Sequence, residues 1–442
     1  MKILIYGLNY APELTGTGKY TAEMAALLAS RGHEVRVVCA PPYYPDWRVS
    51  SGYAGWRYRR EQRDGVAVWR APLWVPSQPS GLKRMIHLAS FAATSLPVLA
   101  WQTFWRPDAV LLIAPTLMCA PATLALAHLA RASAWLHIQD YEVDAAFELG
   151  LLKGSRAARM ARWIESQFLR RFDAVSSITR QMSARATAKG VALSKVVCLP
   201  NWVDVSAIYP LPRASEYCSE LDLADGQKVV LYSGNMGAKQ GIETLAEAAA
   251  SLAYRPDLTF VFCGGAAKES LARRCAALPN CIFLPLQPAE RLNELLNLAD
   301  IHVLPQRGDA ADLVMPSKLT GMFASGRATI AMARRGTALH EAVHARGVVV
   351  PPDNVKALVG AITALANDPE RRVALGRAAR DYAETALSPD STISTFEERV
   401  GMLCRAAGRR RWKASTTYFD ARPSAVTVPH AKPATPEDAA PE

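Results

Sequence analysis

Residues 300–330 read DIHVLPQRGDAADLVMPSKLTGMFASGRATI and predict a strand, a loop and a helix in succession. A short strand over 300–304 leads into a loop that carries Pro316, Ser317 and Lys318, and a helix follows over 319–324. A helix that opens after a parallel strand presents unpaired backbone N–H groups and the positive end of its dipole. With the ammonium of Lys318 nearby, the stretch predicts an anion site, although alone it also fits an ordinary strand–loop–helix.

The same alternation extends through both halves of the chain. In the second half, helices separate apolar strands at 228–234, 258–265, 281–285, 328–332 and 347–351, and two long helices follow at 355–367 and 371–387. The first half predicts strands at 2–6, 34–40, 66–70, 109–113, 135–138, 174–178 and 195–199. Apolar strands that alternate with helices indicate parallel sheets covered on both faces. The predicted fold class is therefore α/β, with two Rossmann-like domains facing across a cleft.

A polar stretch without periodicity divides the two halves. It contains Pro210 and Pro212 and is typical of a linker. We expect a first domain over 1–205, a linker over 206–227 and a second domain over 228–387. A helix over 388–407 is expected to pack back on the first domain. Residues 408–442 are rich in Pro, Ala and charge, and this composition predicts a disordered tail.

Composition narrows the class of partner. Of 442 residues, 50% are hydrophobic and 21% charged, and the net charge of +11 favours anionic partners. The chain shows no aromatic-interleaved basic stripe and no zinc-finger spacing, which argues against nucleic acid. Eight scattered cysteines without a CxxC pair favour a reducing compartment, and the amino terminus lacks signal-peptide features. We therefore expect a cytoplasmic protein.

Two groups of candidate residues lie in the first half. Gly16, Thr17 and Gly18 lie between the first strand and its helix, where glycine lets backbone approach a ligand. The loop is not GxGxxG and no acid ends the second strand, which argues against a ribose-binding NAD site. His137 and Asp140 lie at the carboxyl end of a strand, where they could orient a sugar or a hydroxyl. Alternatively, His137 packs within the strand and Asp140 caps the next helix.

The apolar stretch over 82–105 has two interpretations. It ends in Trp101, Phe104 and Trp105, and His87, Pro97 and Gln102 interrupt it, so it is too short for a transmembrane helix. It is either a core helix or an amphipathic surface that docks into the cytoplasmic leaflet through Trp and Phe, with basic residues on anionic lipid.

Seven motifs resemble one family, the retaining glycosyltransferases of family 4 with the GT-B architecture. The resemblance covers about residues 1–400 and is closest to the branch that makes the exopolysaccharide colanic acid. Its motifs are YAPELTGTGKYTAEMA (10–25), HIQDYEVDAAFELGLL (137–152), LPNWVDVSAIYP (199–210), LYSGNMGAKQGIETLAEA (231–248), FCGG (262–265), MPSKLTGMFASG (315–326) and VVVPPDNVKALVGAITALANDPERR (348–372).

The resemblance assigns the nucleotide-sugar to the second half. The donor-binding residues that it implies are Gly234, Asn235, Gly237, Lys239, Gln240, Gly264, Leu286, Pro316, Ser317 and Lys318. Most members of the family carry Arg and Lys where this chain has Asn235 and Gln240, so we expect Lys318 to supply much of the charge on the diphosphate. The acid that contacts the ribose in relatives corresponds to Gly321, and its companion acid falls near Leu313; the nearby acids Asp309 and Asp312 are out of register.

The resemblance also implies the reaction and its partners. A sugar, fucose from GDP-fucose in this branch, would pass with retention to a lipid-diphosphate-linked oligosaccharide at the inner face of the membrane. Gly16, Thr17 and Gly18 would meet the sugar and phosphates, and His137 and Asp140 would serve as catalytic residues. The donor's own phosphate oxygen would take the acceptor proton, so neither metal nor cofactor is expected. The alternatives are a non-hydrolysing nucleotide-sugar epimerase and a non-catalytic scaffold docked to the membrane.

Overall fold

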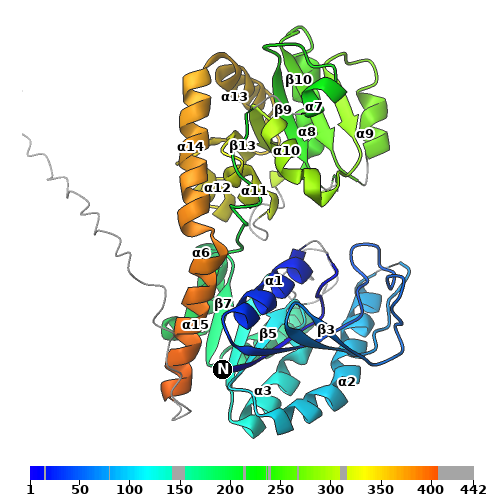
Figure 1. Cartoon of the computed structure of the whole chain (residues 1–442), viewed down its shortest axis with the longest axis vertical. Coiled ribbons are helices and arrows are strands. Elements are labelled where there is room, and N and C mark those ends of the chain that lie inside the picture. The colour runs from blue at the N-terminus through cyan, green and yellow to red at the C-terminus, as the bar shows by residue number, and fades with distance from the viewer. Residues whose placement is uncertain are drawn as a thin grey trace, which may run out of the picture.

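The structure contains two β-sheets, and helices cover each of them (Figure 1). A computed structural model describes residues 1–13, 16–78, 80–141, 155–212, 216–234, 236, 240–265, 268–308 and 316–406. Every strand pairing is parallel except the β3–β4 pair at one edge. The predicted α/β class with two parallel-dominated sheets is therefore confirmed.

The first sheet has eight strands in the order β3-β4-β2-β1-β5-β6-β7-β8. Its strands are β1 (Lys2–Gly7), β2 (Glu34–Cys39), β3 (Arg59–Arg63), β4 (Val66–Arg70), β5 (Ala109–Ala114), β6 (Ser133–Ile138), β7 (Ala174–Ser177) and β8 (Val196–Cys198). The helices between them are α1 (Gly16–Ser30), α2 (Gly81–Trp105), η1 (Leu117–Cys119), α3 (Ala120–Ala130), α5 (Ser155–Leu169), α6 (Arg180–Ala188) and η2 (Leu193–Lys195). The sequence AVLLIA leaves every residue of the central strand β5 buried, because helices cover both faces.

The second sheet has six parallel strands in the order β11-β10-β9-β12-β13-β14. They are β9 (Lys228–Ser233), β10 (Leu258–Cys263), β11 (Cys281–Leu284), β12 (Ile301–Leu304), β13 (Ala328–Met332) and β14 (Val348–Val350). Its helices are α7 (Glu216–Glu220), α8 (Ile242–Ser251), α9 (Lys268–Arg274), η4 (Ala289–Arg291), α10 (Leu292–Leu298), α11 (Lys318–Ala324), α12 (Ala338–Val343), α13 (Val355–Asn367) and α14 (Pro369–Ala386).

Each sheet has one point where the order of its strands reverses. In the first sheet, β1 lies between β2 and β5; in the second, β9 lies between β10 and β12. Parallel α/β sheets bind ligands at the carboxyl ends of the strands beside such a point. The segments that follow β1, β9 and β12 are therefore well placed to bind a ligand.

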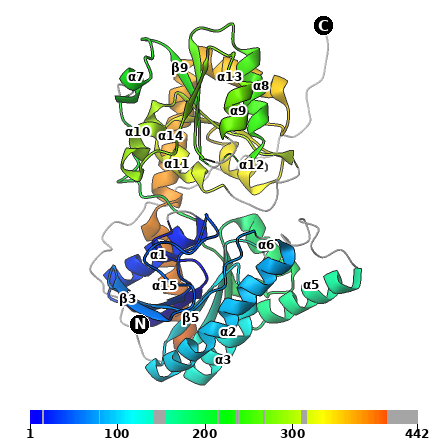
Figure 2. The ribbon, with the colours of Figure 1, turned by 90° about the vertical axis from the view of Figure 1, so that its right-hand side faces the viewer.

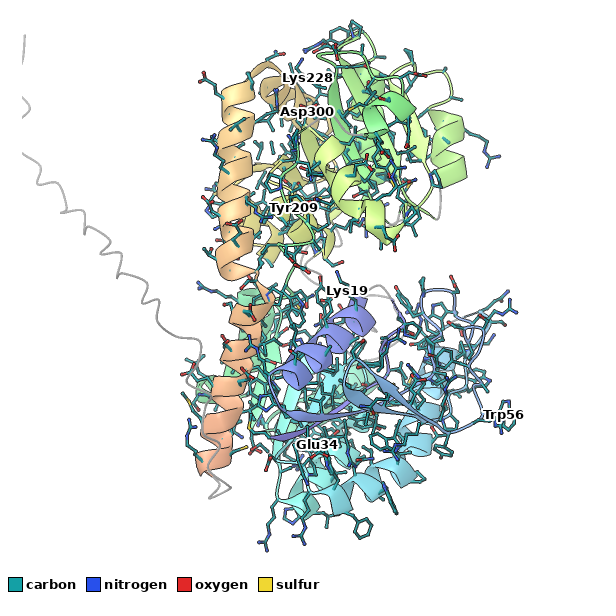
Figure 3. All side chains as sticks on the ribbon, viewed as in Figure 1. Lys19, Glu34, Trp56, Tyr209, Lys228 and Asp300 are labelled. Carbon is teal, nitrogen blue, oxygen red and sulfur yellow. The ribbon has the colours of Figure 1, made fainter. Side chains whose placement is uncertain are left out.

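The carboxyl edges of the two sheets face each other. Lys228, the first residue of β9, and Asp300, directly before β12, lie toward the far end of the upper domain in Figure 3. Glu34, at the start of β2, lies toward the far end of the lower domain. Lys19, in α1, lies at the near end. Helices α1 and α11 both begin at a carboxyl edge, since α1 follows β1 and α11 follows β12.

The last helix, α15 (Pro389–Ala406), packs on the first sheet although it follows the second (Figures 1 and 2). Phe396 is fully buried, and its ring centroid lies 4.8 Å from that of Trp135 in β6. Arg31 pairs with Asp390 and Glu397 at 2.6 Å, and His33 lies 2.8 Å from Glu397. The chain thus passes twice between the sheets. The expected tail over 408–442 lies outside the described residues.

Several elements differ from the sequence expectation. Helix α1 begins at Gly16 and not near Lys19, so Gly16, Thr17 and Gly18 form its first turn. Strand β3 has the charged sequence RREQR, and it pairs with β4 at an exposed edge where no apolar pattern is needed. Helix α6 is largely polar and begins at a cap in which Thr179 accepts from the N–H of Met182. The region expected to be an irregular linker contains the short helix α7.

Removal of the Phe396 side chain tests the attachment of α15. Phe396→Ala should lower the free energy of unfolding by about 3–5 kcal/mol, because a buried ring contact is replaced by a cavity. Urea denaturation followed by tryptophan fluorescence measures the change, and the exposed neighbour Glu398→Ala is the matched control. Equal midpoints for Phe396→Ala and the wild type would show that α15 does not stabilise the first domain.

Candidate active site

Lys318 occupies the reversal point of the second sheet. It is the first residue of α11, and its Nζ donates to the hydroxyl of Tyr232 at 2.6 Å and to Oε1 of Gln240 at 3.4 Å. Tyr232 lies near the end of β9, and Gln240 ends the segment that follows it. The structure therefore brings Lys318 to both ends of the predicted diphosphate loop. Asn235, Gly237 and Lys239, which complete that loop, lie outside the described residues.

Two glycines make this arrangement possible. A Cβ at Gly234 would lie 2.4 Å from Cε of Lys318, and a Cβ at Gly264 would lie 1.9 Å from the carbonyl oxygen of Gly234. Real Cβ atoms do not approach other atoms so closely. Gly234 and Gly264 therefore let the ends of β9 and β10 pack directly against each other and against the lysine stem.

The environment of Lys318 affects its charge. Burial lowers the pKa of the ammonium to about 8, because a partly buried cation loses hydration. An anion placed beside it would restore the charged form, since an opposite charge raises the pKa of an amine. Lys318 is thus positioned to respond to a phosphate.

Two polar residues at this edge are not predicted by the sequence. Tyr232 reads as one more apolar position in the strand KVVLYS, yet its hydroxyl contacts Lys318. Arg307 is exposed, and its backbone N lies 3.3 Å from where a Cβ of Gly241 would be. Gly241, with φ of 62°, is the residue that precedes α8. The start of α8, Arg307 and Lys318 together provide positive potential for a diphosphate.

The remaining residues predicted to bind the donor lie before α11, after β11 and within α11. Ser317 directly precedes α11, with Pro316 before it. Leu286 follows β11 and is 74% exposed, so its side chain is accessible to a ligand. A Cβ at Gly321 would lie 3.2 Å from Cδ1 of Leu296 in α10. A side chain at position 321 would therefore require the end of the Leu296 side chain to shift by a few tenths of an ångström. Asp309, Asp312 and Leu313 lie outside the described residues.

His137 lies in a buried polar network at the end of β6. Its Nδ1 is 2.8 Å from Oγ of Ser176, and its Nε2 is 2.9 Å from the amide nitrogen of Gln139. Gln139 and Asn201 exchange a reciprocal pair of amide hydrogen bonds at 3.0 and 3.1 Å. Burial lowers the pKa of His137 to about 4, so the ring is neutral at physiological pH. Its Nε2 accepts from Gln139 and its Nδ1 donates to Ser176.

The network holds the ring of His137 in its neutral form between two hydrogen-bond partners. Asp140 follows the strand at the same edge and is partly buried. The structure thus brings His137 and Asp140 to the carboxyl edge of the first sheet, as predicted. Their catalytic roles stay predictions.

Gly18 makes room for a buried carboxylate. A Cβ at Gly18 would lie 2.8 Å from Oε2 of Glu13. Oε1 of Glu13 accepts from the backbone N–H groups of Tyr43 and Tyr44 at 3.0 Å, and Oε2 accepts from Asn9 at 2.9 Å. Gly18 therefore allows Glu13 to join the loops after β1 and β2, and a contact with a ligand there stays a prediction. Gly16 has a φ of 58°, and a Cβ at this position would have no atom of the described residues within 4 Å.

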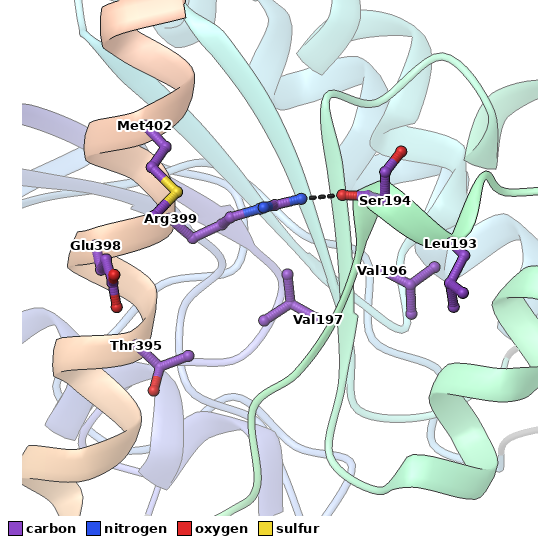
Figure 4. A pocket seen from close by; sticks show the side chains of 8 residues that line it. All are labelled: Leu193, Ser194, Val196, Val197, Thr395, Glu398, Arg399 and Met402. Carbon is purple, nitrogen blue, oxygen red and sulfur yellow. Dashed lines mark hydrogen bonds between the residues drawn. The ribbon is translucent and has the colours of Figure 1, made fainter.

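A pocket lies between β8 of the first domain and α15, away from the predicted site residues (Figure 4). It separates β8 from α15, and its lining residues are Leu193, Ser194, Val196, Val197, Thr395, Glu398, Arg399 and Met402. Arg399 crosses it and donates to the carbonyl oxygen of Ser194. None of the predicted site residues lines this pocket.

No metal centre or disulfide emerges from the described ranges. Within them, no group of three or more His, Cys, Asp or Glu side chains could hold a metal ion, and all eight cysteines are free. None of the helices in these ranges is long and apolar enough to cross a membrane. The expectation that the reaction needs neither metal nor cofactor stays a prediction.

Comparison with known proteins identifies the class that this fold and site define. Residues 15–202 match the family described as Glycosyl transferase 4-like domain, and residues 215–382 match Glycosyl transferases group 1. Sucrose-phosphate synthase from Thermosynechococcus elongatus has the same fold, with a TM-score of 0.71 at 16% identity over 92% of this chain and all of that one. HepE from Anabaena, solved with UDP, has a TM-score of 0.65 at 15% identity, covering 91% of this chain and all of that one.

One relative is similar along almost its whole length. It is an Escherichia coli K12 protein, WcaI, whose name describes a glycosyl transferase of colanic acid biosynthesis. The two sequences are 43% identical over 406 residues, which cover 90% of this chain and 98% of the relative. The chain therefore belongs to the GT-B glycosyltransferases of the family-4 type, as its motifs indicated.

The lowered pKa of Lys318 predicts a pH dependence. If its ammonium binds the donor, kcat/KM for the donor should be constant below pH 8 and fall about tenfold per pH unit above it, because the free enzyme then loses the cation. In Lys318→Arg the fall should disappear up to about pH 10, since a guanidinium stays charged. Steady-state rates from pH 6 to 10 measure both profiles. Identical profiles for the two proteins would show that another group titrates.

Proposed function

We propose that the protein transfers a sugar from a nucleotide-sugar to a lipid-diphosphate-linked oligosaccharide, with retention, during the synthesis of a colanic-acid-like exopolysaccharide. The position of Lys318 at the reversal point, against Gly234 and in contact with Tyr232, carries the proposal. The name of the E. coli relative supports the polysaccharide, and the UDP complex of HepE supports a nucleotide donor. GDP-fucose is the donor that we propose, on the resemblance to the colanic acid branch.

The residues at the carboxyl edge of the second sheet are suited to stabilise the leaving diphosphate. Negative charge develops on its oxygens as the bond to the sugar breaks. Lys318, Arg307 and the start of α8 lie at this edge, where they would stabilise that charge. The sugar would then extend toward the first sheet. There the neutral ring of His137 and the carboxylate of Asp140 would orient the sugar and the acceptor hydroxyl. The donor's phosphate oxygen would take the acceptor proton, which leaves the sugar with its original configuration.

A membrane surface on α2 would bring the lipid-linked acceptor to the site. Helix α2 has 25 residues, so its two ends are roughly 37 Å apart. Leu82, Met85 and Ile86 are all exposed on the first turns, beside Lys83 and Arg84. This end follows β4 and therefore lies at the carboxyl edge, whereas Trp101 and Phe104 lie at the opposite end. We infer that the first turns of α2 contact lipid.

A second basic helix carries similar residues. On α5, which follows β6, the side chains of Met160, Trp163 and Ile164 are exposed at the i, i+3, i+4 spacing of one helical face. Arg156 and Arg159 are exposed on the same helix. Apolar side chains with adjacent arginines are typical of helices that lie on anionic membranes.

Replacement of Lys318 tests the donor site. Lys318→Ala should lower kcat/KM for the donor at least tenfold, because a charge-assisted contact contributes roughly 1.5–3 kcal/mol. A thermal-shift screen of GDP, UDP and GDP-fucose first identifies the nucleotide, since a bound ligand raises Tm. Lys228→Ala, at the opposite end of β9, is the control and should retain wild-type turnover. Wild-type turnover in Lys318→Ala would remove Lys318 from the site.

The products distinguish the proposed reaction from its alternatives. Mass spectrometry of a reaction with donor and lipid-linked acceptor should show a mass increase of one sugar, and proton NMR should show the anomeric configuration of the donor. Isomerisation of the nucleotide-sugar without acceptor would indicate an epimerase. Absence of binding for every nucleotide tested would indicate a scaffold.

Vesicle flotation tests the membrane surface. The double variant Leu82→Ser/Ile86→Ser should bind vesicles that contain anionic phosphatidylglycerol several-fold less than the wild type, because apolar area that enters the interface is lost. Trp101→Ser/Phe104→Ser, at the other end of α2, is the matched control and should float like the wild type. The opposite pattern would assign membrane contact to the far end of the helix.

A further inference from the structure

The segment over 203–212, which leads from the first sheet to the second, is bound along the second domain. In α10, Oδ1 of Asn293 accepts from the backbone N–H of Tyr209 at 3.0 Å. Oδ1 of Asn297 accepts from the backbone N–H of Leu211 at 2.8 Å, and the guanidinium of Arg327 donates to the carbonyl oxygen of Leu211 at 2.6 Å. Tyr209 accordingly lies on the upper domain in Figure 3. Side-chain contacts thus fix this connecting segment to the second domain.

Arg380 of α14 joins the connecting segment to α11. Its Nη1 donates to the carbonyl oxygens of Ile208 and Ala324 at 2.6 and 2.7 Å, and its Nη2 donates to that of Val205 at 3.0 Å. Ala324 is the last residue of α11. The Nε of Arg380 donates to Glu384, one turn further along α14, at 2.5 Å, which orients the guanidinium. One planar cation therefore spans three carbonyl groups from two distant parts of the chain.

Close packing holds the same three elements together around Arg380. A Cβ at Gly376 of α14 would lie 2.1 Å from the carbonyl oxygen of Gly326, which follows α11 by two residues. A Cβ at Gly326 would lie 2.9 Å from Cγ of Pro210 in the connecting segment. Ile208 is buried in the same apolar cluster as Phe323 of α11. The end of α11 is therefore enclosed between α14 and the connecting segment.

Arg380 contacts the end of α11 opposite to Lys318. Lys318 and Ala324 are the first and last residues of this helix, so they are roughly 9 Å apart along its axis. A cation at the carbonyl end of a helix interacts favourably with the negative end of the helix dipole. The backbone hydrogen bonds of so short a helix hold its turns together, so a shift at Ala324 is passed on to Lys318.

We propose that Arg380 is a positioning residue for the donor site, which holds α11 against the connecting segment and thereby keeps Lys318 at the reversal point of the second sheet. This inference rests on the proposed function, because that function gives Lys318 the diphosphate of the donor. A displacement of about 1 Å between reacting groups can lower a rate strongly. Arg380 therefore affects transfer without touching either substrate.

Arg372 provides a matched control on the same helix. Its Nη1 donates to the carbonyl oxygens of Leu365 and Ala366 at 2.5 and 2.8 Å, near the end of α13. Both arginines are partly buried and hold the end of a neighbouring helix, but the carbonyl partners of Arg372 belong to α13 and not to α11. Arg380→Met and Arg372→Met each remove a guanidinium and keep most of the apolar stem. Both should lower Tm, and only Arg380→Met should lower the rate of transfer.

A double-mutant cycle with Lys318→Ala tests the route through the lysine. With GDP-fucose and the lipid-linked acceptor, Arg380→Met should lower kcat/KM for the donor about fivefold, because Lys318 is displaced but not removed. Arg372→Met should stay within about twofold of the wild type. Substitutions at residues that do not contact each other ordinarily have additive effects. If Arg380 acts through Lys318, the double variant Arg380→Met/Lys318→Ala should instead be no slower than Lys318→Ala alone.

A second substitution covers the case in which Arg380→Met does not fold. Arg380→Lys keeps a cation near the three carbonyl groups but not the planar fork, and it then replaces Arg380→Met in the cycle. It should lower kcat/KM by a smaller factor, about threefold, and the loss should again disappear in the Lys318→Ala background.

Three results would overturn the proposal. They are unchanged kcat/KM in the Arg380 variant, additive losses in the double variant, and an equal loss of kcat/KM in Arg372→Met. The outcome is separable from that of the donor assignment. Wild-type turnover in Lys318→Ala would refute the donor contact itself. Impaired Lys318→Ala with an unimpaired Arg380 variant would uphold that contact and refute the role of Arg380.

Discussion

Close packing of backbone at the end of β9 is the constraint on which the second domain depends. The carbonyl group of Gly234 occupies the space where Gly264 would otherwise carry a side chain, and the stem of Lys318 occupies the corresponding space at Gly234. The segments that follow β9 and β10 therefore meet backbone to backbone, and the side-chain stem of Lys318, from the segment after β12, packs against Gly234. This contact places a cation at the reversal point of the sheet, and partial burial then adjusts its charge. The chemistry proposed for the protein follows from that placement.

In the first domain, polar side chains join the loops at the carboxyl edge of the sheet. Glu13 joins the loops after β1 and β2 through three hydrogen bonds, and Gly18 leaves the space for its carboxylate. His137, Gln139 and Asn201 form a second network at the end of β6. Buried polar groups that are fully hydrogen-bonded give an edge a defined shape. The two edges are thus held together in different ways, one through backbone contact and the other through hydrogen bonds.

The sequence predicted most of the fold because its strands are short, apolar and regularly separated by helices. The bounds of α13, for example, agree with the expectation, since an amphipathic pattern begins at Asn354 and ends before Pro369. Strand β3 and helix α6 were missed because they are polar, and an edge strand or a capped surface helix needs no apolar pattern.

The candidate site was predictable only in part. Lys318 and Gly234 follow strands, and the rule for parallel sheets places such residues together. The contact of Tyr232 with Lys318 could not be read from an apolar strand. It joins residues 86 positions apart, and local sequence pattern carries no information about such contacts.

The double passage of the chain between the domains determines how they can move. The first crossing contains Val203, whose N–H donates to the carbonyl oxygen of Leu387 in the second crossing at 2.9 Å. Helix α14 ends directly before Leu387 and α15 begins two residues after it. The two connections are therefore joined at one level. Any rotation of one domain relative to the other would pivot at this level, and the residues farthest from it would then be displaced most.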